Sequence, residues 1–251
     1  MIPRKRIDRL LVERGLFESR AKAQAAIAAG LVTADAVPVG KASDEVRADA
    51  ALCAAPPHPW VSRGGVKLAA ALDHFSVEVA GRACLDVGAS TGGFAEVLLA
   101  RGARRVTAVD VGRAQLHARL RADPRLVSLE ATDIRKLAPA QLGEPAEIIT
   151  IDVSFISLKL VLTSAVALAA PGARLIALIK PQFEVQRRDL KNGIVRDAAL
   201  QARVCHDVEG FVVSLGWRSE GLFTAPITGG DGNQEYFVAA QAGTDRARPS
   251  T

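Results

Sequence analysis

The chain has 251 residues, of which 49% are hydrophobic and 24% are charged, and its formal net charge is +5. This composition excludes disordered, collagen-like and fibrous proteins, and the length predicts one or two globular domains. The 3 cysteines and 4 histidines are scattered and form no CxxC pair, so we expect neither a disulfide framework nor a metal site. We predict no signal peptide and no membrane span, and therefore a protein of the reducing cytoplasm.

Basic residues are concentrated near the N-terminus. Residues 1–22 hold 7 Lys and Arg against 3 Asp and Glu, a balance of +4, which leaves +1 for the other 229 residues. A local cationic patch on a nearly neutral body predicts a segment that binds phosphate backbones, and a solvated helix face is the alternative. The candidate RNA-binding residues of this segment are Arg4, Lys5, Arg6, Arg9, Arg20 and Lys22.

The apolar spacing of residues 4–30 predicts two helices joined by a turn at Gly15. We expect Ser19 to cap the second helix and Gly30 to end it, before a strand at residues 31–33. The segment resembles the S4 RNA-binding domain, including the Ser-Arg-x-x-Ala start of its second helix. The resemblance implies a small α+β domain, which we place at residues 1–55.

Three prolines within residues 56–59 indicate a linker, which we place at residues 56–62. Beyond it, strand-like and helix-like segments alternate, which predicts an α/β domain with a mostly parallel sheet and helices on both faces. We place this domain at residues 63–243 and a flexible tail at residues 244–251. The expected strands are 82–87, 105–110, 126–130, 147–152, 175–180, 218–225 and 234–240, and the expected helices are 66–75, 92–101, 112–121, 157–170 and 198–215.

A glycine-rich loop, residues 86–94, follows the first strand of this domain. Its glycines allow a tight turn and a close approach to a ligand, but their spacing differs from the G-x-G-x-x-G of dinucleotide sites. Acids at three strand ends instead predict S-adenosylmethionine, with Asp86 at its amino group, Asp110 at its ribose and Asp133 at its adenine. A generic nucleotide-binding fold is the alternative. The candidate cofactor-binding residues are Asp86, Gly88, Ser90, Thr91, Gly92, Gly93, Phe94, Asp110, Asp133 and Asp152.

Further charged residues lie at or near strand ends. Asp152 and Lys180 end the fourth and fifth strands, so they share the carboxyl edge of the sheet with the glycine-rich loop. Lys67 lies on the helix before the first strand, and Glu235 lies near the last strand. A lysine at the end of an apolar strand is partly desolvated, which favours the neutral amine, a base. For each residue taken alone, a surface charge or a structural ion pair is the alternative.

Five motifs follow the S4-like segment in this order: SRGGVKL, LDVGASTGGF, DVSFISL, LIKPQFE and NQEYF. Together they resemble the TlyA family of ribosomal-RNA 2'-O-methyltransferases, also labelled haemolysin A-like. The second half of the chain is similar to the FtsJ type, whose Lys-Asp-Lys-Glu tetrad falls on Lys67, Asp152, Lys180 and Glu235. The resemblance implies a Rossmann-like class I methyltransferase fold with a seven-stranded sheet, and S-adenosylmethionine as cofactor. It also implies that the connector at residues 60–61 couples RNA binding to cofactor binding.

The substrate that the resemblance implies is a cytidine ribose of ribosomal RNA within ribosomal subunits. Members that modify both subunits carry extra residues at both ends, so we expect 23S RNA to be favoured over 16S RNA here. We expect Lys180 to act as the general base and Arg63, in the first motif, to contact RNA. We also expect a monomer that needs no metal. The rivals are a membrane-lytic protein, an RNA-binding assembly factor without activity, and a small-molecule methyltransferase.

Overall fold

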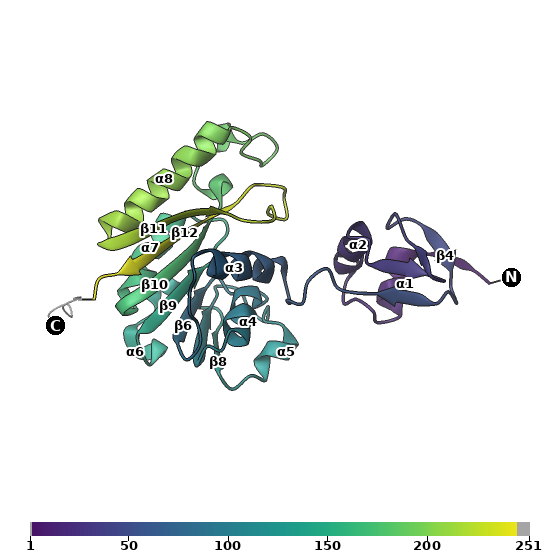
Figure 1. The fold of residues 1–251 in the computed structure, drawn as a ribbon, viewed down its shortest axis with the longest axis horizontal. Helices are drawn as coiled ribbons and strands as arrows, with labels where there is room; N and C mark the ends of the chain where they lie inside the picture. The colour runs from purple at the N-terminus through teal and green to yellow at the C-terminus, as the bar shows by residue number, and fades with distance from the viewer. Residues whose placement is uncertain (1, 245–251) are drawn as a thin grey trace. The chain divides into compact units, whose positions relative to one another are not determined.

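The computed structural model describes residues 2–244, which divide into two compact units between Pro59 and Trp60 (Figure 1). Each unit has a hydrophobic core of its own. Of the tail predicted at residues 244–251, all but Thr244 lies outside the described residues.

The first unit is a small α+β domain. Helices α1 (Ile7–Glu13) and α2 (Arg20–Ala28) pack beside two small antiparallel sheets. The strands pair as β1 (Arg4–Arg6) with β4 (Glu45–Arg47), and β2 (Val32–Ala34) with β3 (Val37–Pro38) and β5 (Leu52–Ala54). Ser19 caps α2, because its Oγ accepts a 3.3 Å hydrogen bond from the backbone N–H of Lys22. The expectation of helix from residue 4 is wrong, since residues 4–6 pair with a distant strand.

The second unit is built on a seven-stranded sheet in the order β11-β12-β10-β9-β6-β7-β8. Only β12 runs antiparallel to its neighbours, β10 and β11, among the described strands. This architecture confirms the predicted α/β fold class. The strands are β6 (Ala83–Val87), β7 (Arg105–Val109), β8 (Leu126–Leu129), β9 (Ala146–Ile151), β10 (Ala169–Ile179), β11 (Trp217–Thr224) and β12 (Tyr236–Ala242).

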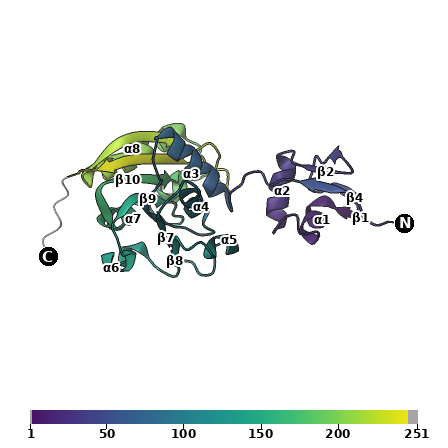
Figure 2. The ribbon, with the colours of Figure 1, turned by 60° about the horizontal axis from the view of Figure 1, so that its bottom comes forward.

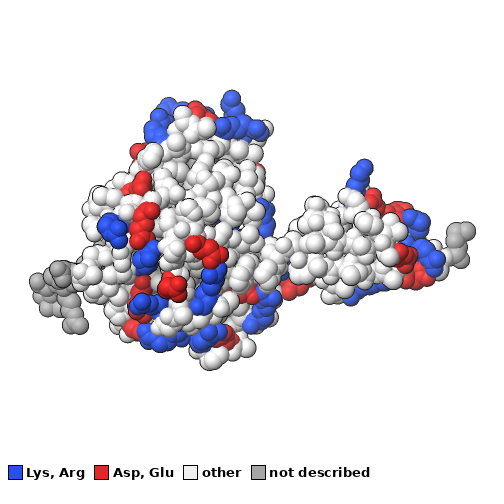
Figure 3. Space-filling view, in the orientation of Figure 1, with Lys and Arg blue, Asp and Glu red and all other residues white. Residues whose placement is uncertain are grey.

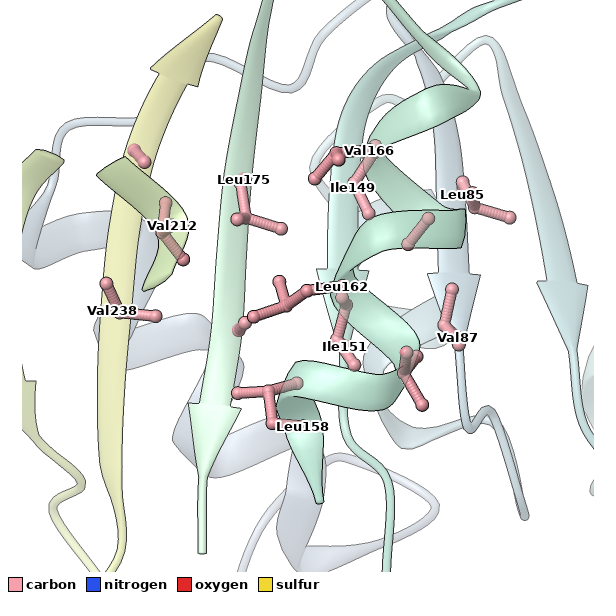
Figure 4. Packing of buried hydrophobic residues seen from close by; sticks show 14 of the residues in the cluster. Leu85, Val87, Ile149, Ile151, Leu158, Leu162, Val166, Leu175, Val212 and Val238 are labelled. Atoms are coloured by element: carbon pink, nitrogen blue, oxygen red, sulfur yellow. The ribbon is translucent and has the colours of Figure 1, made fainter. Parts of the chain in front are cut away.

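Helices cover both faces of this sheet (Figures 1 and 2). One face packs against α3 (Arg63–His74), α4 (Gly93–Ala100) and α5 (Ala118–Arg121). The other packs against α6 (Pro139–Leu142), α7 (Leu158–Ala167) and α8 (Ala198–Ser214). Figure 4 shows α7 placing Leu158, Leu162 and Val166 over side chains of β6, β9 and β10. Because β6, β7, β9 and β10 are parallel, their carboxyl ends meet at one edge, where the motifs lie.

One predicted helix, residues 112–121, forms only at residues 118–121. The carboxylate of Glu130 accepts hydrogen bonds from the backbone N–H groups of Ala114, Gln115 and Leu116, at 2.7 to 3.3 Å. Ala114 has φ +52°, outside the right-handed helical region, so the segment before residue 118 is a loop that this carboxylate binds.

Among the described residues, no helix has both the length and the apolar composition needed to cross a membrane. Within residues 2–244, no group of three His, Cys, Asp or Glu side chains is placed to hold a metal ion.

Candidate active site

Two cavities lie at the carboxyl edge of the sheet. The larger, of about 480 Å³, extends along the ends of β6, β7 and β9. The smaller, of about 220 Å³, lies between α3 and the ends of β6, β9 and β10. Gly88, Ser90, Asp152 and Ser154 line both cavities. A group bound in one cavity therefore borders a group bound in the other.

Lys180 and Asp152 form an ion pair in the smaller cavity. They directly follow β10 and β9, which run parallel side by side, so the two side chains emerge at the same edge. Lys180 Nζ lies 2.6 Å from Asp152 Oδ1 and donates a 2.8 Å hydrogen bond to Ser154 Oγ. These two contacts hold Lys180 Nζ beside Ser154, which lines both cavities.

Lys67 and Glu235 form a second ion pair, although they are 168 positions apart in the sequence. Their side chains are only 8% and 3% exposed, so the pair is almost free of solvent. Lys67 lines the smaller cavity, whereas Glu235 lines neither cavity and contacts Lys67. The four predicted catalytic residues thus form two ion pairs.

Two of the three predicted cofactor acids, Asp110 and Asp133, line the larger cavity. Asp110 follows β7 and accepts hydrogen bonds from the backbone N–H groups of Ser90 and Gly112, at 2.7 and 2.6 Å. Arg135 pairs with Asp133 at 2.6 Å, and its hydrogen bonds lower the pKa of Asp133 to about 2. Asp110 accepts one hydrogen bond on each oxygen and keeps acceptor capacity for a ligand. Arg135 supplies four contacts to the two oxygens of Asp133, so a ligand at Asp133 would displace one of them.

The third acid, Asp86, lies beneath the cavities. Its side chain is fully buried on β6, and its Oδ1 accepts a 2.9 Å hydrogen bond from the hydroxyl of Thr150 on β9. Burial raises the pKa of Asp86 to about 7. Asp86 lines neither cavity, and its contact with the amino group of the cofactor stays a prediction.

The glycines of the loop are required by protein neighbours. Gly88 has φ +82°, and a Cβ there would lie 2.4 Å from the backbone oxygen of Asp152. A Cβ on Gly93 would lie 2.0 Å from Ser62 Oγ, and one on Gly92 would meet a leucine of α5 at 2.4 Å. Gly92 lines neither cavity, so its expected contact with a cofactor is replaced by packing. The predicted loop residues that do line a cavity are Gly88, Ser90, Thr91, Gly93 and Phe94.

Comparison with known proteins places this arrangement in a family. Residues 60–242 match the family model of FtsJ-like methyltransferases, and residues 5–52 match that of S4 domains. The chain is 46% identical, over 98% of its length, to the 16S/23S rRNA (cytidine-2'-O)-methyltransferase TlyA of Mycobacterium tuberculosis, 93% of which is covered. The protein belongs to the TlyA family of FtsJ-like methyltransferases. The family expected from the motifs is thereby confirmed.

Other TlyA-like relatives carry a different label. The chain is 36% identical to Hemolysin A of Brachyspira hyodysenteriae, with 93% of this chain and 98% of that protein covered. A solved structure from Streptococcus thermophilus, titled as a hemolysin, matches with a TM-score of 0.76 and 38% identity over 97% of this chain and 90% of that one.

Most of the predicted RNA-binding cations of the S4 domain are paired with acids. Figure 3 shows basic and acidic side chains intermixed near the N-terminal strand of this domain. Arg9 is exposed and has no side-chain partner among residues 2–244, and Arg63, in the second unit, donates a 2.5 Å hydrogen bond to the backbone oxygen of Thr228. The paired cations are Arg6 and Arg20 with Asp8, Lys5 with Glu13, and Lys22 with Glu18, while Arg4 bonds to the backbone of Glu45.

Asp8 pairs with two of these cations, Arg6 and Arg20. Its side chain is fully buried between α1 and α2, and it accepts hydrogen bonds from Arg6, Arg20 and Gln24. The hydrogen bonds from Arg6, and then those from Arg20 and Gln24, outweigh burial and lower the pKa of Asp8 well below its usual range. Arg6 and Arg20 therefore stabilise the S4 domain itself, and replacing either one disturbs folding as well as any RNA contact.

Because the pKa of Asp8 is lowered by folding, the stability of the S4 domain should depend on pH in the acidic range. A carboxyl group whose pKa is depressed by folding contributes its full stabilisation above its unfolded pKa of about 4, and loses it as the pH falls toward the folded pKa. We expect an Asp8→Asn variant to be less stable than the parent at pH 7, with the difference shrinking below pH of about 4. Hydrogen exchange of α1 in the full chain, compared between parent and variant at each pH, measures this difference in stability. Asp49→Asn, which breaks an exposed pair with Arg47, is the control and should change little. A difference independent of pH would contradict the assignment.

The sequence analysis missed three features of the site. Ser154, in the DVSFISL motif, bonds to Lys180 and lines both cavities. Phe155, which has φ +64° and is 91% exposed, lines the larger cavity and lies beside Phe183, with ring centroids 5.1 Å apart. Residues 191–194 form a hairpin turn around an Asn-Gly pair, a sequence signal of that turn type that was available.

Proposed function

We propose that this protein transfers a methyl group from S-adenosylmethionine to the ribose 2'-oxygen of a cytidine in ribosomal RNA. The observation that carries the proposal is the shared wall of the two cavities, formed by Gly88, Ser90, Asp152 and Ser154. This shared wall lies between the Lys180–Asp152 pair and the larger cavity, which Asp110 and Asp133 line. The names of the family relatives, which describe cytidine 2'-O-methylation of 16S and 23S RNA, support the same reaction.

The larger cavity fits the cofactor. Asp110 offers acceptors for the two hydroxyls of a ribose, and Asp133 offers one for the amino group of an adenine. The cofactor supplies a methyl group on a positively charged sulfur, which makes that carbon open to attack by a nucleophile. Gly88 lines both cavities, and a Cβ there would lie 2.4 Å from the backbone oxygen of Asp152, so the shared wall depends on a glycine.

Lys180 is the group we assign to the 2'-hydroxyl. In its neutral form, Nζ accepts the hydroxyl proton as the oxygen attacks the methyl carbon. The ion pair with Asp152 opposes this neutral form, and the second amine in the same cavity, that of Lys67, favours it through like-charge repulsion. Asp152 and Ser154 hold Nζ in place, and alignment of the reacting atoms supplies much of the rate.

We assign RNA binding to the S4-like residues 1–55, a linker to residues 56–62 and methyl transfer to residues 63–243. We also propose that the protein acts as a monomer and needs no metal. A ribosomal-RNA substrate places this activity in the cytoplasm.

The cofactor assignment predicts the effect of an Asp110→Ala variant. Hydrogen bonds to a charged acceptor contribute about 1.5 to 3 kcal/mol each, so losing even one raises the Kd for S-adenosylmethionine roughly tenfold or more. Isothermal titration calorimetry measures the change. Asp73→Ala, which removes an exposed acid paired with Arg101, is a matched control. An unchanged Kd in the Asp110 variant would place the ribose elsewhere.

The reaction itself is tested by transfer of radiolabelled methyl to separated 30S and 50S subunits, followed by mapping of the modified ribose. We expect label on a cytidine of the 50S subunit, and label on the 30S subunit would extend the substrate to 16S RNA. Turnover without RNA would indicate a small-molecule methyltransferase. Absence of transfer to either subunit would favour an assembly factor, and release of dye from lipid vesicles would favour the lytic activity that the hemolysin label suggests.

A further inference from the structure

The connection between β10 and α8 carries the most prominent set of free cations near the site. Arg187, Arg188, Lys191 and Arg196 are all exposed. Within residues 2–244, none of the four side chains forms a hydrogen bond or an ion pair with another residue. Residues 186–197 hold these 4 cations against Asp189 and Asp197, a net charge of +2. Figure 3 shows Lys and Arg gathered over this connection and the start of α8.

This segment is built as an ordered structure. Arg187–Asp189 form a turn of 3₁₀ helix, and Lys191 and Ile194 exchange backbone hydrogen bonds of 3.0 and 3.1 Å across the Asn192-Gly193 turn. Both turn residues have positive φ, +55° and +79°, as the tight turns that suit a β-hairpin require. Asp197 is occupied by the first turn of α8, because its carboxylate accepts the backbone N–H groups of Ala199 and Leu200. That carboxylate is therefore engaged with the helix rather than with the neighbouring cations.

A buried asparagine attaches the segment to the catalytic motif NQEYF. The side chain of Asn233, only 1% exposed, accepts a 3.0 Å hydrogen bond from the backbone N–H of Val195 and donates one of 2.9 Å to the oxygen of Gly193. Asn233 lies two positions from Glu235, and Arg187 lies seven positions after Lys180. The cations are therefore held at the same edge of the sheet as both ion pairs.

We propose that the segment 187–196, held by Asn233, binds backbone phosphates of the RNA strand that carries the target ribose. The inference rests on the proposed function, and it adds an RNA contact on the methyltransferase domain to those of the S4 domain. Phosphates are the matching partner, because four uncompensated cations on a polar, ordered loop gain little from a neutral or apolar surface. The contrast with the S4 domain is direct, since most of its predicted cations are already paired with acids.

The test uses the full-length R187A/R188A variant and measures its binding to ribosomal RNA by fluorescence anisotropy at several salt concentrations. If two phosphate contacts are lost, the slope of the logarithm of the RNA-binding constant against the logarithm of salt concentration should become shallower by about 1 to 2. Binding at moderate salt should weaken about tenfold. The KM for RNA should rise by a similar factor. The Kd for S-adenosylmethionine should stay at the parental value, because neither arginine lines a cavity.

Two further variants separate charge from structure. R101A/R218A removes the same number of cations from the opposite edge of the sheet and should keep the parental slope. R187K/R188K keeps both charges and should also keep it. A parental slope and affinity in R187A/R188A, or an equal loss in R187K/R188K, would overturn the proposal. If the parent binds RNA but transfers no methyl group, the proposed function fails, while the binding data still decide whether the segment contacts phosphates.

Discussion

A Lys180→Ala variant is expected to lose methyl transfer, with kcat lowered about 10²- to 10⁴-fold, the range that a positioned general base contributes. The Kd for S-adenosylmethionine should stay within about tenfold of the parent, because Lys180 lines the smaller cavity and not the larger one. Single-turnover transfer to ribosomal subunits measures the first quantity and calorimetry the second. Lys159→Ala, a lysine of α7 outside both cavities, is the matched control.

A Lys180→Arg variant distinguishes a base from a positive charge. Arginine can keep the pair with Asp152, but its guanidinium does not lose a proton in proteins. If Lys180 accepts the hydroxyl proton, Lys180→Arg should be as inactive as Lys180→Ala. Recovery of most of the activity would show that the residue acts through its charge, and near-parental turnover in Lys180→Ala would assign the proton to another group.

A Glu235→Gln variant is expected to lose about 3 to 5 kcal/mol of stability, because it leaves the ammonium group of Lys67 buried without its carboxylate. The burial of both partners, 8% and 3% exposed, is what makes this effect large. Exposed pairs such as Arg101 with Asp73 contribute far less. Thermal or urea unfolding of the full chain measures the loss. An unfolding midpoint equal to that of the parent would show that Lys67 reaches solvent or another acceptor.

The double variant Lys67→Met/Glu235→Met separates folding from catalysis. Replacing both members of a buried pair by apolar residues of similar size is often neutral or stabilising, so the double variant should recover most of the stability. Methyl transfer should remain lost, because no amine then faces the smaller cavity from α3. A stable and fully active double variant would remove this pair from the mechanism.

Local sequence patterns are enough to predict the fold class and the edge of the sheet at which the site lies. Alternating strands and helices predict parallel strands, and the carboxyl ends of parallel strands must meet. Asp110, Asp152 and Lys180 each follow a strand directly, so their approach to one edge could be predicted from local patterns. The order of five motifs was enough to recognise the family, because each motif is a short contiguous string.

Which charges pair and which face a cavity depends on contacts between segments that are distant in the sequence. Lys67 with Glu235 is a contact across 168 positions, and no local pattern specifies such a partner. Asp86 lies inside β6, one residue before its end, and is fully buried, with Thr150 on the next strand donating a hydrogen bond to it. Residues 112–117 stay a loop, because Ala114 has φ +52° and the carboxylate of Glu130 binds backbone donors there. Local propensities contribute only a few tenths of a kcal/mol per residue, so buried polar contacts between distant segments override them.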